Sequence, residues 1–267
     1  MNRLLSMLYW VSMSAIFAFI VLPLLVVVMA SVSPAEGMTL NPSQWTLSWF
    51  ASVFTDEWLE PFFLSLWIAL LVAIVSGICG LLGAYAVVYE KVPGHATLMA
   101  FFMSPLAVPQ IVKGVAIVLI LSSAGVYAAL GTPGLIAAHI VLTLPYGVRM
   151  IATALQNFSR NLDAAAQVLG ASKRQRIQRI LLPLIKPGIF SGMTFSFVIS
   201  FNNIPLSLFL VRPGQTTLPI TIINYMEYSI DPVLSAVNVA SLVFVLAVIL
   251  VFERIGGFAG ELHGGSR

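Results

Sequence analysis

Long runs of apolar residues alternate with short polar segments along this chain. Six runs approach the roughly 20 residues with which a helix crosses the hydrocarbon core of a bilayer: residues 8–31, 61–88, 97–122, 133–156, 188–210 and 234–253. The first run is longer than the roughly 7–15-residue core of a signal peptide, so we expect a retained span. The pattern predicts an all-α membrane protein with six transmembrane helices in a single domain, residues 1–267.

The longest polar interruption, residues 157–187, separates the fourth and fifth runs. Asn161 is a good N-cap, and the apolar face that follows it ends at Gly170, a residue suited to the left-handed C′ position. Ser172 and Gln175 have the spacing of a capping box. The second helix would then present an apolar face, until prolines disturb it: Ile177, Ile180, Leu181 and Leu184, with Pro183 and Pro187. The loop is therefore predicted to hold two short helices that lie on a membrane or dock into a partner.

Composition and charge agree with a membrane location. Hydrophobic residues make up 59% of the chain and charged residues 9%, against roughly 25% charged in soluble domains. With the N-terminus inside, most of the 13 basic residues fall on or near the cytoplasmic side, and so does the C-terminus. The loop between the first two runs has no basic residue and should be outside. The net charge of +3 is explained by basic residues on the cytoplasmic side of the membrane. We therefore expect the lipid bilayer, and no nucleic acid, as a partner.

The sequence contains no recognisable motif for nucleotide hydrolysis, metal binding or catalysis. No lysine follows a glycine as a P-loop requires, so any nucleotide hydrolysis must belong to a partner. His95, His139 and His263 have no spacing that suggests a metal site or a triad, and His139 is expected to be a hydrogen-bonded packing residue. We therefore expect no catalytic residue, metal or cofactor in this chain.

Two segments interrupt the apolar pattern. Pro105 and Pro109 lie within the third run, where each removes a backbone hydrogen bond and frees a carbonyl. They indicate either a packed kink or a wall of a transport pathway. Residues 211–234, after the fifth run, are too polar to cross a bilayer and too apolar for a free loop. We expect this segment to lie at the outer surface or to re-enter partly.

The polar loop also resembles a known motif. Ala164, Ala165, Ala166, Gly170, Ile180, Leu182 and Pro183 have the spacing of the EAA loop of ABC importer permeases, E-A-A-x3-G-x9-I-x-L-P. The wider text LGASKRQRIQRILLPLIKPGI, with MSPLAVPQIV in the third run and LFLVRPGQTTLPITI near the end, resembles the spermidine/putrescine-type permease subfamily. The likeness covers most of the chain.

This resemblance implies a type I ABC importer permease in the bacterial inner membrane. It implies a second homologous permease subunit, which we expect to be a different chain. It also implies two cytoplasmic ATPase subunits that bind ATP and Mg²⁺, and an external solute-binding protein. The loop would be the ATPase-coupling element, through Asp163 and the seven motif residues. We expect Gly170→Asp to uncouple transport from ATP hydrolysis or to block assembly.

The motif departs from the family at its first position. Ala164 replaces the glutamate, so the capping-box partner of Asn161 at N3 is missing. This loss would weaken the start of the helix by about 0.5–2 kcal/mol. Asp163 would compensate through the helix dipole. Ala164→Glu is therefore expected to be tolerated.

A second departure concerns the solute. Polyamine-type relatives tend to carry acidic residues in the fifth span, where this chain has Asn202 and Asn203. Lys113 lies inside the third run, where an ammonium is costly and marks a candidate site. Together they favour a solute with an anionic or zwitterionic group, such as a carboxylate or phosphonate. The alternative for Lys113 is to snorkel to the outer face.

The leading interpretation is the permease of an ATP-driven importer. A secondary transporter or channel without an ATPase is the alternative, against which stand the motif spacing and the scarcity of carboxylates within the spans. A membrane-embedded enzyme ranks last because no acid, base and nucleophile are clustered.

Overall fold

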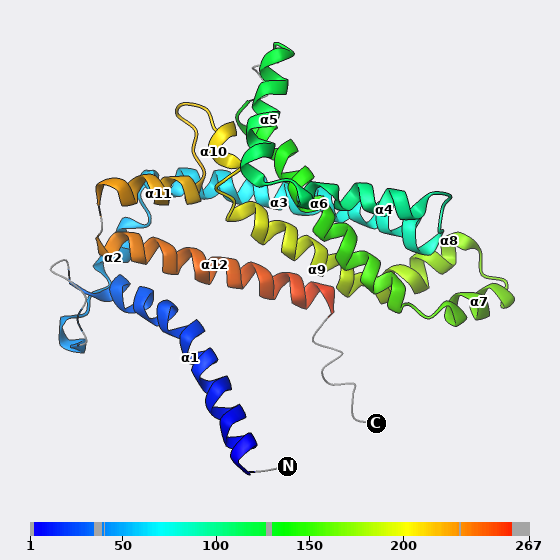
Figure 1. Cartoon of the computed structure of the whole chain (residues 1–267), viewed down its shortest axis with the longest axis horizontal. Helices are drawn as coiled ribbons and strands as arrows, with labels where there is room; N and C mark the ends of the chain where they lie inside the picture. Colours follow the sequence, from blue (N-terminus) through cyan, green and yellow to red (C-terminus); the bar gives the residue numbers. More distant parts are fainter. Residues whose placement is uncertain (1–2, 35–38, 40, 127–129, 230, 258–267) are drawn as a thin grey trace. The chain divides into compact units, whose positions relative to one another are not determined.

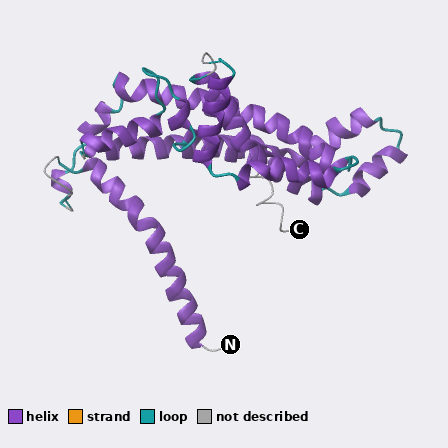
Figure 2. Ribbon diagram, turned by 45° about the horizontal axis from the view of Figure 1, so that its top comes forward, coloured by secondary structure: helices purple, strands orange, loops and turns teal. Residues whose placement is uncertain are grey.

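The computed structural model describes residues 3–34, 39, 41–126, 130–229 and 231–257. Across these ranges the secondary structure is helical, with no strand among them (Figure 2). The residues from 258 to the C-terminus, which include His263 and the end predicted to be cytoplasmic, lie outside the described part.

Among the described residues, five helical stretches are long and apolar enough to cross a membrane. They are α1 (Arg3–Val32), α3 (Asp56–Ala84) with the π-helical turn η2 (Tyr85–Tyr89), α6 (Thr132–Asn157), α9 (Leu182–Phe201) with the residues from Lys173 that lead into it, and α12 (Pro232–Gly256). A bent pair adds a sixth candidate. The predicted all-α fold is confirmed, and the six predicted spans correspond to these five stretches and the bent pair.

The third apolar run is a broken helix. α4 (His95–Met103) and the 3₁₀ turn η3 (Ser104–Ala107) are followed, after Val108 and Pro109, by α5 (Gln110–Ser123), and the two halves are bent by 98°. Pro109 precedes α5 as its N-cap, with Val108 extended at φ −98° and ψ 129°. The break therefore lies where the prolines withdraw their N–H groups.

The fifth run has different limits from those expected. The helix reaches back without interruption to Lys173, through α8 (Lys173–Arg176) and the π-helical turn η5 (Ile177–Leu181), and α9 ends at Phe201. A short helix, α10 (Ser207–Leu210), follows an irregular turn. Ile204 precedes Pro205 in that turn, and the residue before a proline avoids the helical region. Residues 211–234 contain α11 (Leu218–Tyr228).

The chain divides into two compact units, of which Met1–Glu60 and Ile222–Val245 form the first. Here the 3₁₀ turn η1 (Pro42–Gln44) and α2 (Ser48–Ser52) follow α1, and the Trp49 indole N–H donates to the carbonyl of Ser33. Trp58 packs on Tyr225 with 5.1 Å between ring centroids. Asp231 accepts hydrogen bonds from the Tyr225 hydroxyl and the amide of Val233, so it caps the start of α12.

The second unit, Pro61–Thr221 and Leu246–Arg267, contains the loop that resembles the permease motif. Within it α6 and α9 lie side by side (Figure 1). They approach closely because Gly192 of α9 faces Gly147 of α6, where a Cβ on Gly192 would lie 3.2 Å from the Gly147 Cα. On another side of α6, a Cβ on Gly147 would lie 2.8 Å from the Ser76 carbonyl of α3. Small residues thus bring three spans into backbone contact.

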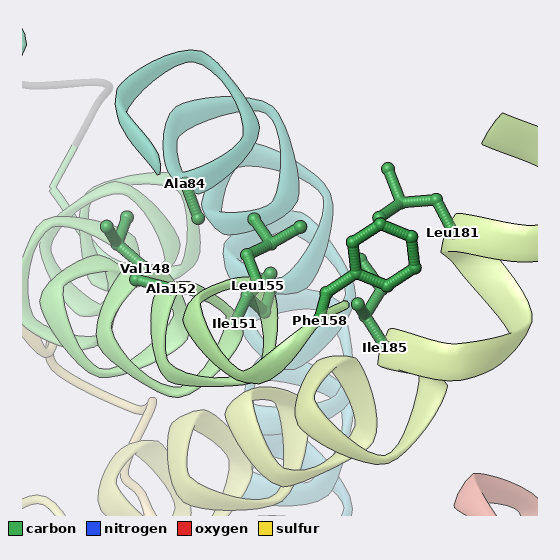
Figure 3. Close-up of a cluster of buried hydrophobic side chains, with 8 residues drawn as sticks. All are labelled: Ala84, Val148, Ile151, Ala152, Leu155, Phe158, Leu181 and Ile185. Carbon is green, nitrogen blue, oxygen red and sulfur yellow. The ribbon is translucent and has the colours of Figure 1, made fainter. Parts of the chain in front are cut away.

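One end of these three spans shares an apolar core, shown in Figure 3. Its buried members come from α3, from α6 and the residue after it, and from the η5–α9 segment: Ala84, Val148, Ile151, Ala152, Leu155, Phe158, Leu181 and Ile185. Leu181 and Ile185 are each 1% exposed. This cluster, called the loop-side core below, supports both ends of the polar loop.

Candidate functional site

A helical hairpin follows α6 and leads into α9 (Figure 1). Its first helix, α7 (Arg160–Val168), has Ser159 as its N-cap, with no side-chain capping bond. The prediction that Asn161 caps this helix is wrong, since Asn161 is its second residue. Ala164 is therefore its fifth residue, and the absence of glutamate there removes no capping-box partner. The start lies earlier because Phe158 is buried in the loop-side core and Ser159 is extended, so the turn is made before Asn161.

The turn between α7 and α8 follows the sequence prediction. Gly170 has φ +85°, the left-handed conformation that glycine adopts without strain. Ser172 forms the expected capping box, with its hydroxyl accepting from the Gln175 amide at 3.3 Å and its own amide donating to the Gln175 side chain at 2.8 Å. The α7–α8 hairpin thus has a defined break and a defined restart.

The two apolar faces of the hairpin have different surroundings. The apolar side chains that follow α8 turn inward, where Ile177 and Ile180 of η5 and Leu182 of α9 pack against the loop-side core. The end of α7 is bare, with Val168 88% and Leu169 87% exposed. Ala164 and Ala165 are also exposed, and Ala166 is half-buried. The most exposed apolar side chains of the hairpin therefore lie at the end of α7 and not on the second helix.

The join between α8 and α9 contains a proline without breaking the helix. Pro183 is the second residue of α9, directly after the π-helical turn η5. A π-helical turn shifts the hydrogen-bond pattern by one residue, which accommodates the N–H that Pro183 lacks. The hairpin therefore continues into the span as one helical body.

Arg176 ties the two hairpin helices together. Its guanidinium lies 3.3 Å from the carboxylate of Asp163 and donates to the side-chain oxygen of Gln167 at 2.6 Å. The side chains of Arg176 and Asp163 are only 15% and 20% exposed, so solvent screens this contact less than an open surface pair. Asp163, expected at the motif's edge, thus acts within the hairpin.

The predicted pathway residues lie at two helix breaks. The Lys113 ammonium donates to the Pro105 carbonyl at 2.8 Å, across the bend between α4 and α5. Asn203, 5% exposed, donates to the Gln110 side chain at 2.8 Å and accepts from the Leu206 amide. Asn202 is exposed and donates to the Val198 carbonyl. The Asn203–Gln110 bond brings the two breaks together, while Lys113 and Asn203 are each engaged within the fold.

His139 joins both sides of the second break. It is 1% exposed on α6, and its two ring nitrogens lie 2.8 Å from the Ser200 hydroxyl of α9 and 2.9 Å from the Ser207 hydroxyl of α10. Its expected role as a hydrogen-bonded packing residue is confirmed. The sequence did not identify the serines, because they lie 61 and 68 positions from His139 along the chain and only the fold places both against its imidazole.

The family model of binding-protein-dependent transport system inner membrane components matches residues 76–257. The chain belongs to this family. The match includes the hairpin and both helix breaks, and it identifies the chain as a permease component of an ABC importer. It decides against a secondary transporter or channel without an ATPase.

The permease also resembles individual proteins along most of its length. It is 26% identical over 245 residues to the spermidine/putrescine permease PotC of Haemophilus influenzae, covering 91% of this chain and 94% of the relative. It is 28% identical over 244 residues to PhnV of Salmonella choleraesuis, a protein named for 2-aminoethylphosphonate transport, covering 91% of each chain.

Solved structures share the fold of the permease. A bacterial ABC transporter involved in alginate import matches with a TM-score of 0.71 and 16% identity, over 94% of this chain and 96% of the other. The same kind of transporter in complex with its periplasmic protein matches at 0.69. Within the described ranges, no group of three side chains is placed to hold a metal ion.

Proposed function

We propose that this permease pairs with a second, homologous permease subunit and is driven by two cytoplasmic ATPase subunits that bind the α7–α8 hairpin. An external binding protein would deliver the solute. In the bacterial inner membrane, the hairpin and both termini would face the cytoplasm. The observation that carries the proposal is the exposed pair Val168 and Leu169, which are apolar and stand on a helix end braced by Arg176.

Rigidity supports this role. A hairpin transmits movement from an ATPase only if it is firmly connected to the spans. The η5 turn that follows α8 packs into the loop-side core through Ile177, Ile180 and Leu181, and the helix continues without a loop into α9. A partner that pulls on α7 would therefore displace α9 instead of deforming the hairpin.

Charged substitutions at the end of α7 test the ATPase docking. Val168→Asp and Leu169→Asp should abolish co-purification of the ATPase and ATP-dependent uptake, because each would place a carboxylate in an apolar contact. Tyr228→Asp is the matched control for co-purification, since Tyr228 on α11 is equally exposed at 87%. Full retention of the ATPase by both hairpin variants would refute the docking.

For the solute, we propose a small polar molecule with an anionic or zwitterionic group. Two relatives are named for the transport of polyamines and of 2-aminoethylphosphonate. Both kinds of solute carry an amine, and the phosphonate also carries an anionic group. Lys113 uses one of its three N–H donors on Pro105, which leaves two for a ligand. Asn202 is exposed and supplies further hydrogen-bonding groups. Asn203 would hold the second break in position through its hydrogen bonds to Gln110 and Leu206.

Charge removal at Lys113 tests this pathway. Lys113→Gln keeps a donor for the Pro105 carbonyl but loses the charge, whereas Lys113→Met loses both. If the ammonium contacts the solute, both variants should reduce the rate or apparent affinity of uptake of the identified solute. If the ammonium serves only the bend, Lys113→Gln should transport like wild type, and that result would overturn the pathway role.

A further inference from the structure

The C-terminal end of α3 and η2 receives a cap from a distant part of the chain. Arg160, the first residue of α7, donates from one guanidinium nitrogen to the carbonyls of Val88 at 3.1 Å and Tyr89 at 2.8 Å. Its guanidinium carbon also lies 4.9 Å from the centroid of the Tyr89 ring. The last carbonyls of a helix lack partners within the helix and carry partial negative charge, so a cation there is favourable.

A second contact joins the same helix end to α8. Lys173 lies 2.8 Å from the carboxylate of Glu90, which also accepts from the Tyr85 hydroxyl at 2.6 Å. The Lys173 bond, followed by that from Tyr85, lowers the pKa of Glu90 below its usual value. Glu90 therefore stays charged, and the contact persists, at neutral pH. Because both side chains are well exposed, this pair should contribute less than the contacts of Arg160.

These contacts surround one polar cleft of about 310 Å³. The turn η2 at the end of α3 supplies Tyr89 and its C-cap Glu90, and the hairpin supplies Arg160, Asp163, Lys173 and Arg176. Every charged group here has a partner of opposite charge or a carbonyl. The cleft is thus a polar joint between α3 and the hairpin, while the loop-side core joins the same elements through apolar side chains.

We propose that Arg160 is a positioning residue of the transport cycle, which makes α3 move with the hairpin so that ATP-driven movement reaches two spans, α3 and α9. This inference rests on the proposed function, because it assumes that an ATPase moves the hairpin. Arg160 makes two hydrogen bonds to backbone carbonyls and one contact with a ring. Movement of the hairpin would therefore be transmitted directly to the backbone at the end of α3. Glu90 and Lys173 steady the same joint.

The test uses the complete transporter, with its ATPase, second permease and binding protein, in proteoliposomes. Arg160→Ala should lower the amount of solute moved per ATP hydrolysed by roughly two- to thirty-fold while the complex still assembles. Arg160→Lys should be intermediate, because an ammonium does not reproduce the planar fork and the stacking. Arg254→Ala, an exposed arginine in the last turn of α12 and outside the hairpin, is the matched control and should leave this ratio unchanged.

A distance measurement separates coupling from simple support. Cys79 is the chain's only cysteine and lies exposed on α3, so it can carry one spin label, with a second at Asn161→Cys on α7. With Arg160 present, the distance between labels should be the same in nucleotide-free and ATP-bound complexes. In Arg160→Ala the two states should differ. Equal distances in both states of Arg160→Ala, or a wild-type transport ratio, would overturn the inference.

Exchange of charges gives an independent check on the joint. Glu90→Lys and Lys173→Glu should each lower the transport ratio, and the double exchange should restore it. Failure of the double exchange to improve on either single variant would exclude the pair from the joint. If the complex with wild-type permease shows no ATP-dependent uptake, the proposed function and this inference both fail. If the wild-type complex transports and Arg160→Ala has the same transport ratio as wild type, the inference alone fails.

Discussion

Gly170 is the residue on which the shape of the hairpin depends most directly. Its φ of +85° is unfavourable for residues with a side chain, yet a Cβ built on it would meet no atom within 4 Å. The requirement is therefore one of backbone torsion and not of space. The stability of a variant at this position should depend on how well the new residue adopts the left-handed region. Its binding to a partner should depend in addition on whether the new side chain fits.

Gly170→Val and Gly170→Asn separate these two requirements. Valine should destabilise the hairpin by about 1–2 kcal/mol because of its Cβ, while asparagine, which visits the left-handed region more readily, should cost less. Thermal unfolding of the purified permease would measure the difference. Equal losses would show that torsion is not the limiting factor. Gly170→Asp, which also tolerates this torsion in part, then reports mainly on the fit to the ATPase.

His139 makes a second prediction at this scale. His139→Leu would orphan the hydroxyls of Ser200 and Ser207, and each lost bond should cost about 0.6–1.7 kcal/mol within a membrane protein. Combining it with Ser200→Ala and Ser207→Ala should recover part of the stability, because no buried hydroxyl then lacks a partner. The midpoint of thermal unfolding in detergent is the measurement. A triple variant less stable than His139→Leu would contradict this account.

Helices α3, α6 and α9 are the spans that the proposed coupling would move. Their separation is set where backbone meets backbone at Gly80, Gly147 and Gly192. Close packing of this kind leaves little freedom for the helices to slide past one another. Movement of α9 should therefore be shared with its neighbours by packing, in addition to the polar joint at Arg160.

Gly80→Ala tests this contact, with Gly77→Ala as its control on the same helix. A Cβ at Gly80 would lie 2.9 Å from the Gly147 carbonyl carbon and 3.0 Å from the Val148 nitrogen, so helix axes would have to separate. A Cβ at Gly77 would meet the flexible side chain of Met193, which can adopt another rotamer. Gly80→Ala should cost about 1–3 kcal/mol and Gly77→Ala clearly less, as measured by unfolding in detergent. The reverse order would refute the backbone contact.

At the scale of the whole molecule, the distribution of charge predicts its orientation in the membrane. The basic residues of the hairpin and the acidic start of α3 fall at opposite sides in the predicted topology. In a Cys79→Ala background, a membrane-impermeant thiol reagent should label Asp56→Cys in intact cells. It should label Arg174→Cys only after the membrane is permeabilised. Labelling in the opposite order would invert the topology and remove the hairpin from any cytoplasmic ATPase.

Local patterns sufficed for much of this permease. The apolar runs predicted the helices, Gly170 and the Ser172–Gln175 capping box predicted the hairpin turn, and Pro105 and Pro109 predicted the interruption of the third run. Each of these features depends on residues a few positions apart, whose interactions are set by backbone geometry. The spacing of the loop motif likewise indicated the family from the sequence alone.

Only the tertiary structure decided which partners these residues have. It packed the apolar face of η5 against the loop-side core and left Val168 and Leu169 exposed. It also ended α9 at Phe201, set Lys113 against the Pro105 carbonyl and placed Arg160 on the end of α3. These contacts join segments whose relative position depends on the packing of whole helices. No local pattern encodes that packing, because burial and pairing are properties of the assembled spans.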